Sequence, residues 1–235
     1  MLVVNENVKL IAQDLVDKLG SFQVSVLADA IGALKDNRNA VLGDKIHGVK
    51  AGLKFAGVAV TVKAPDGNLF PIQYALYKGY PGAVLCIDTG KHMENPYLGE
   101  MMAFTARGFG YKAIVIDGLI RDKAEIMDMD YPVFALGTHP MPKAPSVGGE
   151  INVEINLDGA AVHPGDFIAG DDDGMVVITP ACAADILAIA ETKAQADAQR
   201  LENIKKFFAA PVESRDIYST MGPGFAKQYK LLEDK

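Results

Sequence analysis

Apolar and polar positions alternate with a helical period in the first 34 residues of the chain. Apolar side chains recur every three or four residues over 6–19 and again over 21–34, which predicts two amphipathic helices. Asn5 or Asn7 suits the N-cap of the first helix, and Gly20 suits a left-handed stop at its end. The chain is therefore expected to open with a helical pair.

The middle of the chain carries short apolar runs that are too brief for helices with an exposed face. The runs predict buried strands over 57–64, 83–88, 113–116 and 132–136. The segments between them predict helices over 70–77, 97–108 and 122–129. Strands that alternate with helices of this length are typical of βαβ units, so we expect parallel neighbours in one sheet.

The last third of the chain changes to short strands and then to a long helix. Strands are expected over 151–157, 160–162, 167–169 and 175–178, with turns between them that favour antiparallel pairing. Pro180 suits the first turn of a helix that continues to about residue 208. We predict an α/β fold with one domain over 1–210 and a C-terminal extension over 211–235.

Composition and charge exclude several classes of function. The chain has 235 residues, a net charge of −7 and two cysteines outside any CxxC motif, which argues against a nucleic-acid binder and against a zinc or redox motif. The N-terminus lacks a basic region followed by an apolar core, and no apolar run approaches the roughly 18 residues of a membrane span. We expect a cytoplasmic protein that binds neither nucleic acid nor membrane.

Two acidic residues remain as candidates for a metal site. The four histidines are scattered, and Asp171-Asp172-Asp173-Gly174 lacks the alternating ligands of an EF-hand loop, so a solvated turn is the expected role of that segment. Mg²⁺ uses few carboxylates and keeps several waters. Asp122, after the predicted turn at Asp117-Gly118, and Glu100, in the first turn of the predicted helix over 97–108, suit such an ion together with a further acid from elsewhere in the chain.

Each of these acids also has an ordinary structural explanation. The predicted strand over 113–116 is expected to break at Asp117-Gly118, and Arg121-Asp122 follows at once. The pair is explained equally well by a site at the carboxyl end of a strand, by a structural ion pair, or by Asp122 as an N-cap. Glu100 is either a site residue or an acid placed favourably in the first turn of a helix.

An ordered set of motifs resembles one known superfamily. The motifs are Gly57-Val58-Ala59-Val60-Thr61-Val62, Pro81-Gly82-Ala83-Val84-Leu85, Leu98-Gly99-Glu100, Asp117-Gly118-Leu119-Ile120-Arg121-Asp122, Pro132-Val133-Phe134-Ala135, Val162-His163-Pro164-Gly165-Asp166 and Asp173-Gly174-Met175-Val176-Val177-Ile178. Together they resemble the RraA-like superfamily over roughly residues 20–205. The group holds class II 4-hydroxy-4-methyl-2-oxoglutarate/4-carboxy-4-hydroxy-2-oxoadipate aldolases and regulators of ribonuclease activity.

The resemblance implies a fold and a site. The fold is a compact β/β/α sandwich of the swivelling-domain type with a long C-terminal helix, assembled into homotrimers or dimers of trimers (hexamers). Arg121 would hold the pyruvyl end of the substrate, and Asp122 would bind Mg²⁺ or Mn²⁺. Glu100 would reach the metal through water, as would Asp197 of a neighbouring subunit. The substrate carboxylate would bind at Gly99 and Glu100 and to the backbone amides of Met101 and Met102.

The resemblance also implies a reaction and a rival function. The reaction is metal-dependent retro-aldol cleavage of a 4-hydroxy-2-oxo acid to pyruvate and a second oxo acid, with decarboxylation of oxaloacetate through the same pyruvate enolate. The enzyme would be a carbon–carbon lyase acting on a small 2-oxo acid. The rival is a non-catalytic regulator that binds a ribonuclease or an RNA helicase. The loop over 89–96, which holds His92 and Asn95, and the tail after residue 210 both depart from the superfamily pattern.

Overall fold

A computed structural model describes residues 1–34, 40–141, 148–215 and 220. The chain divides into two compact units, Met1–Leu187 and Ala188–Lys235, and the long helix α6 (Ala183–Ala209) begins in the first and continues in the second. The second unit also holds a short 3-10 helix, η2 (Val212–Ser214). Over the described residues, no helix has both the length and the apolar character needed to cross a membrane.

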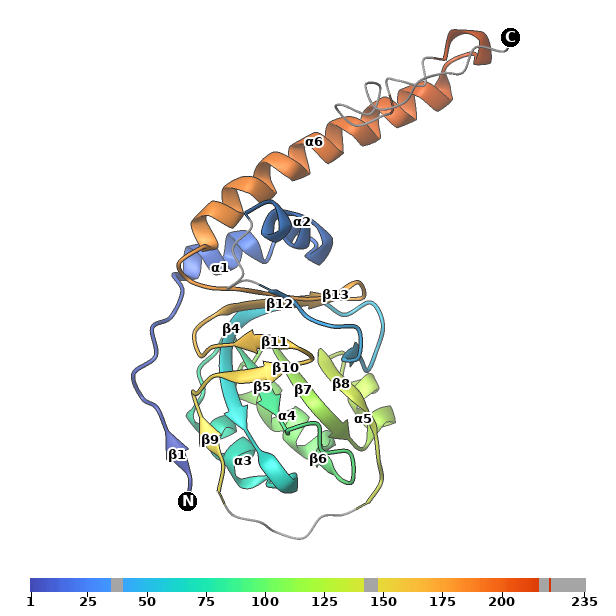
Figure 1. The fold of residues 1–235 in the computed structure, drawn as a ribbon. Coiled ribbons are helices and arrows are strands. Elements are labelled where there is room, and N and C mark those ends of the chain that lie inside the picture. The colour runs from blue at the N-terminus through green and yellow to red at the C-terminus, as the bar shows by residue number, and fades with distance from the viewer. Residues whose placement is uncertain (35–39, 142–147, 216–219, 221–235) are drawn as a thin grey trace, which may run out of the picture. The chain divides into compact units, whose positions relative to one another are not determined.

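The first unit is built on one large mixed sheet, whose centre is parallel (Figure 1). The four central strands are neighbours in the order β4 (Phe55–Lys63), β5 (Ala83–Asp88), β7 (Ala113–Ile120) and β8 (Val133–Thr138). All three contacts between them are parallel, as the alternation of strands and helices predicts. Because their carboxyl ends meet at one edge, residues that follow these strands lie close together.

Shorter strands extend this centre on both sides. Beyond β4, the antiparallel neighbours are β12 (Phe167–Asp171), β13 (Gly174–Ile178) and β2 (Ala40–Val41), while β3 (His47–Gly48) pairs with β8. Three more short strands join the sheet: β1 (Val3–Val4), β6 (Pro96–Leu98) and β9 (Glu150–Ile151). A separate hairpin is formed by β10 (Ile155–Leu157) and β11 (Ala160–Val162).

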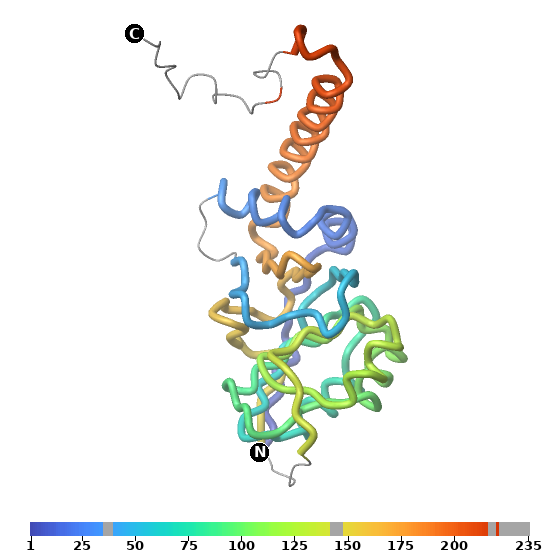
Figure 2. The backbone as a smooth tube through the Cα atoms, turned by 90° about the vertical axis from the view of Figure 1, so that its right-hand side faces the viewer, coloured from blue at the N-terminus to red at the C-terminus, as the bar shows by residue number. Residues whose placement is uncertain are grey.

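Helices cover the sheet in two groups. The helix α3 (Phe70–Lys78), preceded by the 3-10 turn η1 (Pro65–Gly67), packs on β4 and β5, and α4 (Glu100–Gly108) packs on β7 and α5 (Lys123–Asp128). The helix α1 (Gln13–Leu19) contacts β4, and α2 (Val24–Leu34) contacts β12 and β13, as the blue segments of Figures 1 and 2 show. This arrangement buries the central strands on both faces.

The side chains of the central strands alternate between two apolar cores. On the face of α3 and α4, the core contains Leu85, Ile87, Ile114 and Ile116. On the face of the β10–β11 hairpin, it contains Val84, Cys86, Ala113 and Val115. Strands buried on both faces read as continuous apolar runs, which is why β5 was predicted with its observed bounds.

The first predicted helix is much shorter than its apolar pattern. It begins at Gln13 rather than near residue 6, its N-cap is Ala12, and Gly20 is right-handed with φ −66°, so both predicted caps were wrong. The segment before it is extended because β1 pairs with β9. The Asn5 side chain donates to the Asn152 carbonyl instead of capping a helix.

The predicted break at Asp117-Gly118 was also wrong, because β7 continues through it to Ile120. Pairing with β6 on one side and β8 on the other holds the strand, with a register shift between Ile116 and Leu119. Thr89 approaches this point closely: its Oγ1 donates to the Asp117 carbonyl at 2.5 Å. A Cβ on Gly118 would lie 2.6 Å from Thr89 Cγ2, so glycine serves close packing here rather than a turn.

Candidate functional site

Arg121 and Asp122 connect the carboxyl end of β7 to α5. Asp122 occupies the N-cap position of that helix with φ 57° and ψ 46°, a left-handed conformation that is uncommon outside glycine. Its side chain makes no capping hydrogen bond to α5. An N-cap role therefore does not explain this aspartate.

The Asp122 carboxylate is directed toward the start of α4. The backbone N–H of Glu100 donates to Asp122 Oδ2 at 3.2 Å, and Arg121 Nε lies 3.5 Å from the same oxygen. The side chains of Arg121 and Asp122 are 50% and 38% exposed, and an ion pair this open contributes little to stability. Arg121 and Asp122 thus form the predicted ion pair, but its small contribution to stability does not explain why these two residue types occur here.

Gly99 makes this approach possible. A Cβ at this position would lie 2.2 Å from Asp122 Oδ2 and 3.0 Å from Arg121 Cγ. The first distance is shorter than any contact between non-bonded atoms allows. The Arg121 N–H donates to the carbonyl of Leu98 at 2.9 Å, so the two segments are also joined through the backbone. The close contact between Gly99 and Asp122 fixes the carboxylate against the first turn of α4.

The first turn of α4 offers one acid and several amides. Glu100 is exposed, and Met101 is 79% exposed. The N–H groups of Met102 and Ala103 both donate to the Gly99 carbonyl at 3.1 Å. The Met102 amide therefore already has a partner within the turn, and the role of Met101 and Met102 in holding a carboxylate stays a prediction.

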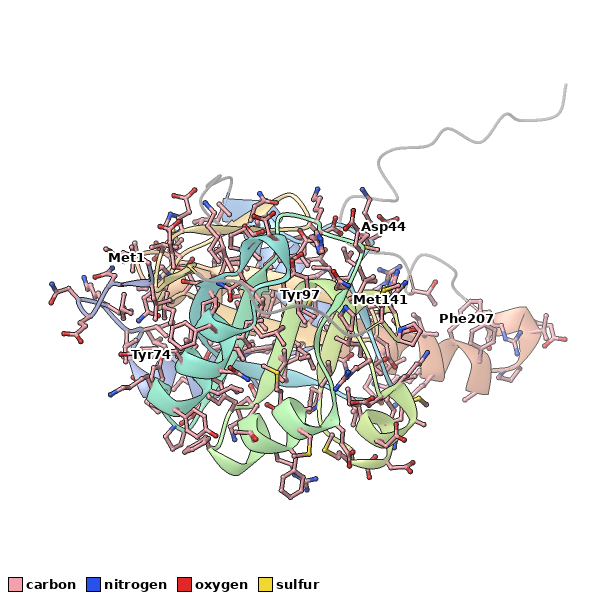
Figure 3. The ribbon with its side chains drawn as sticks, turned by 90° about the horizontal axis from the view of Figure 1, so that it is seen from below. Met1, Asp44, Tyr74, Tyr97, Met141 and Phe207 are labelled. Atoms are coloured by element: carbon pink, nitrogen blue, oxygen red, sulfur yellow. The ribbon has the colours of Figure 1, made fainter. Side chains whose placement is uncertain are left out.

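Two hollows flank the Arg121–Asp122 pair. The first, of about 240 Å³, is mostly apolar and lies between the pair and Gly99, Tyr97 and Met141; Tyr97 and Met141 are labelled in Figure 3. The second, of about 320 Å³, lies between the pair and Lys123, Thr138, His139 and Pro140. Arg121 and Asp122 line both hollows, so a ligand held by them has room on either side.

The donor set at this site fits a hydrated divalent cation better than a zinc-type centre. Among the residues that the structure describes, no three His, Cys, Asp or Glu side chains are grouped to hold a metal. Asp122 Oδ2 is engaged by Glu100 and Arg121, whereas Oδ1 has no partner within the described ranges. One direct carboxylate, a nearby acid in Glu100 and open space for water are the requirements of Mg²⁺ or Mn²⁺.

Asp197 lies in the second unit, on α6. Its Oδ1 is 3.6 Å from Lys193 Nζ, one helical turn earlier, and its side chain is 48% exposed. An exposed pair of this spacing is worth a few tenths of a kcal/mol, about 0.3–0.5. The role that the resemblance gives to Asp197, as a ligand of metal-bound water in a neighbouring subunit, stays a prediction.

The loop between β5 and β6 reaches the first hollow through Tyr97. The His92 ring packs edge-on against the Tyr97 ring at 5.8 Å, and the His92 N–H donates to Thr89 Oγ1. The Tyr97 hydroxyl accepts the N–H of Gly67 at 2.6 Å, which fixes the ring from the other end. His92 therefore packs against Tyr97, which lines the first hollow, so the loop contributes to that hollow indirectly.

A second carboxylate on β7 has the opposite surroundings. Asp117 is 1% exposed, and its Oδ1 has no hydrogen-bond partner among the described residues. Burial raises the pKa of the Asp117 carboxyl, a shift opposed by the Asp158 N–H and by Lys91 and increased by Asp88 and Asp158. Asp117 lines neither hollow beside Arg121, so this buried acid is separate from the candidate site.

Sequence reasoning missed the side chains that line the second hollow. Lys123 follows Asp122 directly, Thr138 is the last residue of β8, the parallel neighbour of β7, and His139 follows it. The signal was available, because residues after adjacent parallel strands meet at one edge of the sheet. The predicted strand over 132–136 ended two residues early, before Thr138.

Known proteins resemble the chain over most of its length. A protein of Halalkalibacterium halodurans named "Putative 4-hydroxy-4-methyl-2-oxoglutarate aldolase" is 29% identical over 189 residues, which cover 80% of this chain and 87% of that protein. A crystal structure of an uncharacterized protein from Pseudomonas syringae superposes with a TM-score of 0.74 at 24% identity, covering 91% of this chain and 100% of the other.

A second solved structure shows the same fold. Streptomyces coelicolor RraAS2, described as an unusual member of the RNase ES inhibitor RraA protein family, has a TM-score of 0.71 at 24% identity, covering 83% of this chain and 98% of its own. The model of the RraA-like family, Aldolase/RraA, matches residues 24–177, which include every strand from β2 to β12 and the Arg121–Asp122 site. The chain belongs to the RraA-like family.

Proposed function

We propose that the protein is a divalent-metal-dependent carbon–carbon lyase acting on 2-oxo acids. Its reaction is the cleavage of a 4-hydroxy-2-oxo acid to pyruvate and a second oxo acid, together with the decarboxylation of oxaloacetate. The observation that carries the proposal is the position of the Asp122 carboxylate, held against the first turn of α4 beside Arg121 and open to a hollow. The relative named as an aldolase supports the same class of reaction.

Both reactions leave negative charge on the 2-oxo oxygen of pyruvate, and the site has groups suited to that charge. Asp122 would bind the cation directly and Glu100 would bind it through water; when bound, Mg²⁺ or Mn²⁺ supplies Lewis-acid stabilisation of the developing charge. Arg121 carries a permanent charge and a planar set of donors, which orient and neutralise the same end of the substrate.

The carboxylate of the 2-oxo acid needs its own partner. The start of α4 is the positive end of the helix dipole, and the Met101 N–H there has no partner within the described ranges, whereas the N–H groups of Glu100 and Met102 are engaged. We assign the pyruvyl carboxylate to this turn, at Gly99, Glu100, Met101 and Met102. Binding there would direct the 2-oxo oxygen toward Arg121.

Retro-aldol cleavage also requires loss of the proton on the 4-hydroxyl. As the C3–C4 bond breaks, its electron pair moves to C3 and on to the 2-oxo oxygen, and the 4-hydroxyl becomes a carbonyl. Glu100 is exposed in the first turn of α4 and can accept that proton through an intervening water; return of a proton to C3 of the enolate then gives pyruvate. Decarboxylation needs no such base, because the leaving group carries no proton.

We further propose that the working form is a homotrimer or a dimer of trimers. Met101 and Phe104 on α4 are 79% and 65% exposed, and apolar side chains exposed together mark contact surfaces. In such an assembly, Asp197 of a neighbouring copy would complete the site. If so, mixing inactive Asp122→Asn and Asp197→Ala proteins, with subunit exchange, restores a part of the wild-type rate; equal inactivity before and after exchange contradicts a shared site.

The direct test of the reaction is pyruvate release from oxaloacetate. We expect turnover with Mg²⁺ or Mn²⁺, loss of turnover with EDTA and recovery when the metal is returned. A protein that acts only as a binding regulator of a ribonuclease or helicase gives no turnover under any of these conditions. The absence of metal-dependent pyruvate release above the rate of the free metal would contradict the proposal.

A further inference from the structure

The second hollow has a polar character that the proposed reaction has not used. It lies at the ends of β7 and β8, is not lined by Gly99, and has a volume of about 320 Å³. Beside the Arg121–Asp122 pair, its side chains that bear hydrogen-bond donors are Lys123, Thr138 and His139. With Arg121 and Lys123 against one carboxylate, fixed charge in this hollow favours an anion.

Hydrogen bonds at both its backbone and its ring fix the position of His139. Its backbone N–H donates to the Ile120 carbonyl at 2.9 Å, which fixes the residue beside the end of β7. Its Nδ1 accepts the N–H of Met141 at 3.2 Å, so the neutral ring carries its proton on Nε2. The Nε2–H is therefore a donor with a set direction, and within the described ranges it has no partner.

Lys123 has no structural role that accounts for it. It is the first residue of α5, where a positive charge gains nothing from the helix dipole. The side chain is exposed, and in the part of the chain that the structure describes it makes no ion pair or hydrogen bond. A lysine that is free, beside a directed histidine donor, is suited to binding a ligand.

From these contacts we infer that the second hollow binds the carboxylate at the far end of the substrate, through Lys123 Nζ and His139 Nε2. The inference rests on the proposed function, which sets the 2-oxo end between Arg121, Asp122 and the start of α4. Because Arg121 and Asp122 line both hollows, a 2-oxo acid held by them at one end can place its far carboxylate in the second hollow. Lys123 and His139 are thus specificity-determining residues that select substrates with a second carboxylate.

The test is an equilibrium measurement with two acids that differ at one end. 2-Oxoglutarate has a terminal carboxylate and 2-oxopentanoate has a methyl group there, and neither has the 4-hydroxyl needed for cleavage. We expect calorimetry in the presence of Mg²⁺ to show that 2-oxoglutarate binds about 10- to 100-fold more tightly, the range for hydrogen bonds to a charged group. Lys123→Ala and His139→Ala should each remove most of that ratio.

Lys112→Ala provides a matched control, because Lys112 is an exposed lysine before β7 and lines neither hollow. This variant should retain the wild-type ratio. Equal affinity of the wild-type protein for the two acids, or an unchanged ratio in both Lys123→Ala and His139→Ala, would overturn the inference. Thermal unfolding of each variant excludes misfolding as the cause of a lost ratio.

A separate measurement distinguishes failure of this inference from failure of the proposed function. Pyruvate has no far carboxylate, so exchange of its methyl protons with deuterium, followed by NMR, reports enolate formation alone. Metal-dependent exchange in the wild-type protein without preference for 2-oxoglutarate rejects only the second hollow. Absence of exchange, of oxaloacetate turnover and of preference together rejects both.

Discussion

Asp117 and Asp122 lie five residues apart on one strand and its following turn, yet their surroundings differ in every respect. Asp117 is 1% exposed, has an oxygen without a partner among the described residues and sits in regular strand backbone. The Asp122 side chain is 38% exposed, is bound by Glu100 and Arg121 and sits in a left-handed conformation. Burial makes an acid harder to ionise, whereas exposure beside a cation keeps it available as a ligand.

The difference shows which signal identifies a site in this protein. A raised pKa is a common mark of catalytic acids, and among the carboxylates it marks Asp117 and Asp166. Asp117 does not line the hollows at Arg121, so its shift reflects packing under the β10–β11 hairpin. What supports Asp122 as the site residue is instead a carboxylate held against the start of α4 and open to two hollows.

The largest expected effect comes from neutralising each carboxylate in turn. Asp122→Asn should lower metal-dependent pyruvate release from oxaloacetate by about 10³-fold or more, because a cation ligand is lost. Asp117→Asn should leave the rate within about threefold, because the side chain lies outside the site. Steady-state assays at saturating Mg²⁺ measure both, with Asp128→Asn on α5 as a control for loss of one exposed charge.

Comparable loss of activity in the two variants would break the distinction between a structural and a functional acid. Full activity in Asp122→Asn would remove Asp122 from the site altogether. Circular dichroism and thermal unfolding should accompany the assays. Asp117 is buried, so Asp117→Asn is the variant in which a loss of activity could come from a folding defect.

A smaller effect is expected when the position of Asp122 is disturbed and its charge is kept. In Gly99→Ala, the new Cβ would lie 2.2 Å from Asp122 Oδ2, so the carboxylate has to move. We expect about 10²-fold lower activity, the order of loss from a misplaced group, with a free energy of unfolding close to wild type. Denaturant unfolding and the oxaloacetate assay measure the two quantities.

Gly108→Ala is the matched control for this substitution. Gly108 is at the end of the same helix, and a Cβ there meets no atom within 4 Å. This variant should keep its activity and gain slightly in stability, by up to about 1 kcal/mol. Unchanged activity in Gly99→Ala would mean that the position of Asp122 is not critical.

The smallest expected effect is a pH dependence of stability that comes from Asp117. Because burial raises its pKa in the folded state, the folded form holds a proton that the unfolded form releases, so this group makes stability fall as pH rises from the ordinary aspartate range through the raised pKa. Asp117→Asn removes the titration. The melting temperature of the variant minus that of the wild type should therefore increase between pH 4 and pH 8. The expected increase is about 2–4 °C for each kcal/mol of unfolding free energy that the wild type loses through this titration.

Measurements of thermal unfolding across this range should include Asp166→Asn as a second case. Asp166 is 3% exposed and burial also raises its pKa, while its contacts with His163 lower it. A melting-temperature difference between wild type and Asp117→Asn that does not change with pH would contradict a raised pKa for Asp117 in the folded state.

Much of the fold was predictable where burial alone sets the pattern. The bounds of β5 follow from a six-residue apolar run, and the start of α3 at Phe70 was also as predicted. Asp117-Gly118 misled because the pair is common in turns, while the pairing of β7 with β6 and β8 overrides that preference. The start of the first helix was missed because β1 pairs with β9, about 147 residues away in the chain.

The site was predictable in part. The order of motifs selected Arg121, Asp122 and Glu100, and the structure brings the backbone N–H of Glu100 to the Asp122 carboxylate, while the roles of the three side chains stay predictions. His139 and Lys123 were missed because neither belongs to a motif, and only the parallel pairing of β7 and β8 brings them together. The role predicted for Asp197 requires a neighbouring subunit, so it stays a prediction.

The left-handed backbone of Asp122 restricts which residues evolution can accept at this position. Glutamate is as good an oxygen ligand as aspartate, but positive φ is adopted readily by glycine, asparagine and aspartate and much less by longer side chains. If Asp122 binds the proposed cation, a lineage that keeps the cation is expected to keep aspartate itself, and one that loses it is expected to drift to asparagine or glycine. On the proposed function, the residue at position 122 of a related sequence would then indicate whether the metal chemistry has been retained.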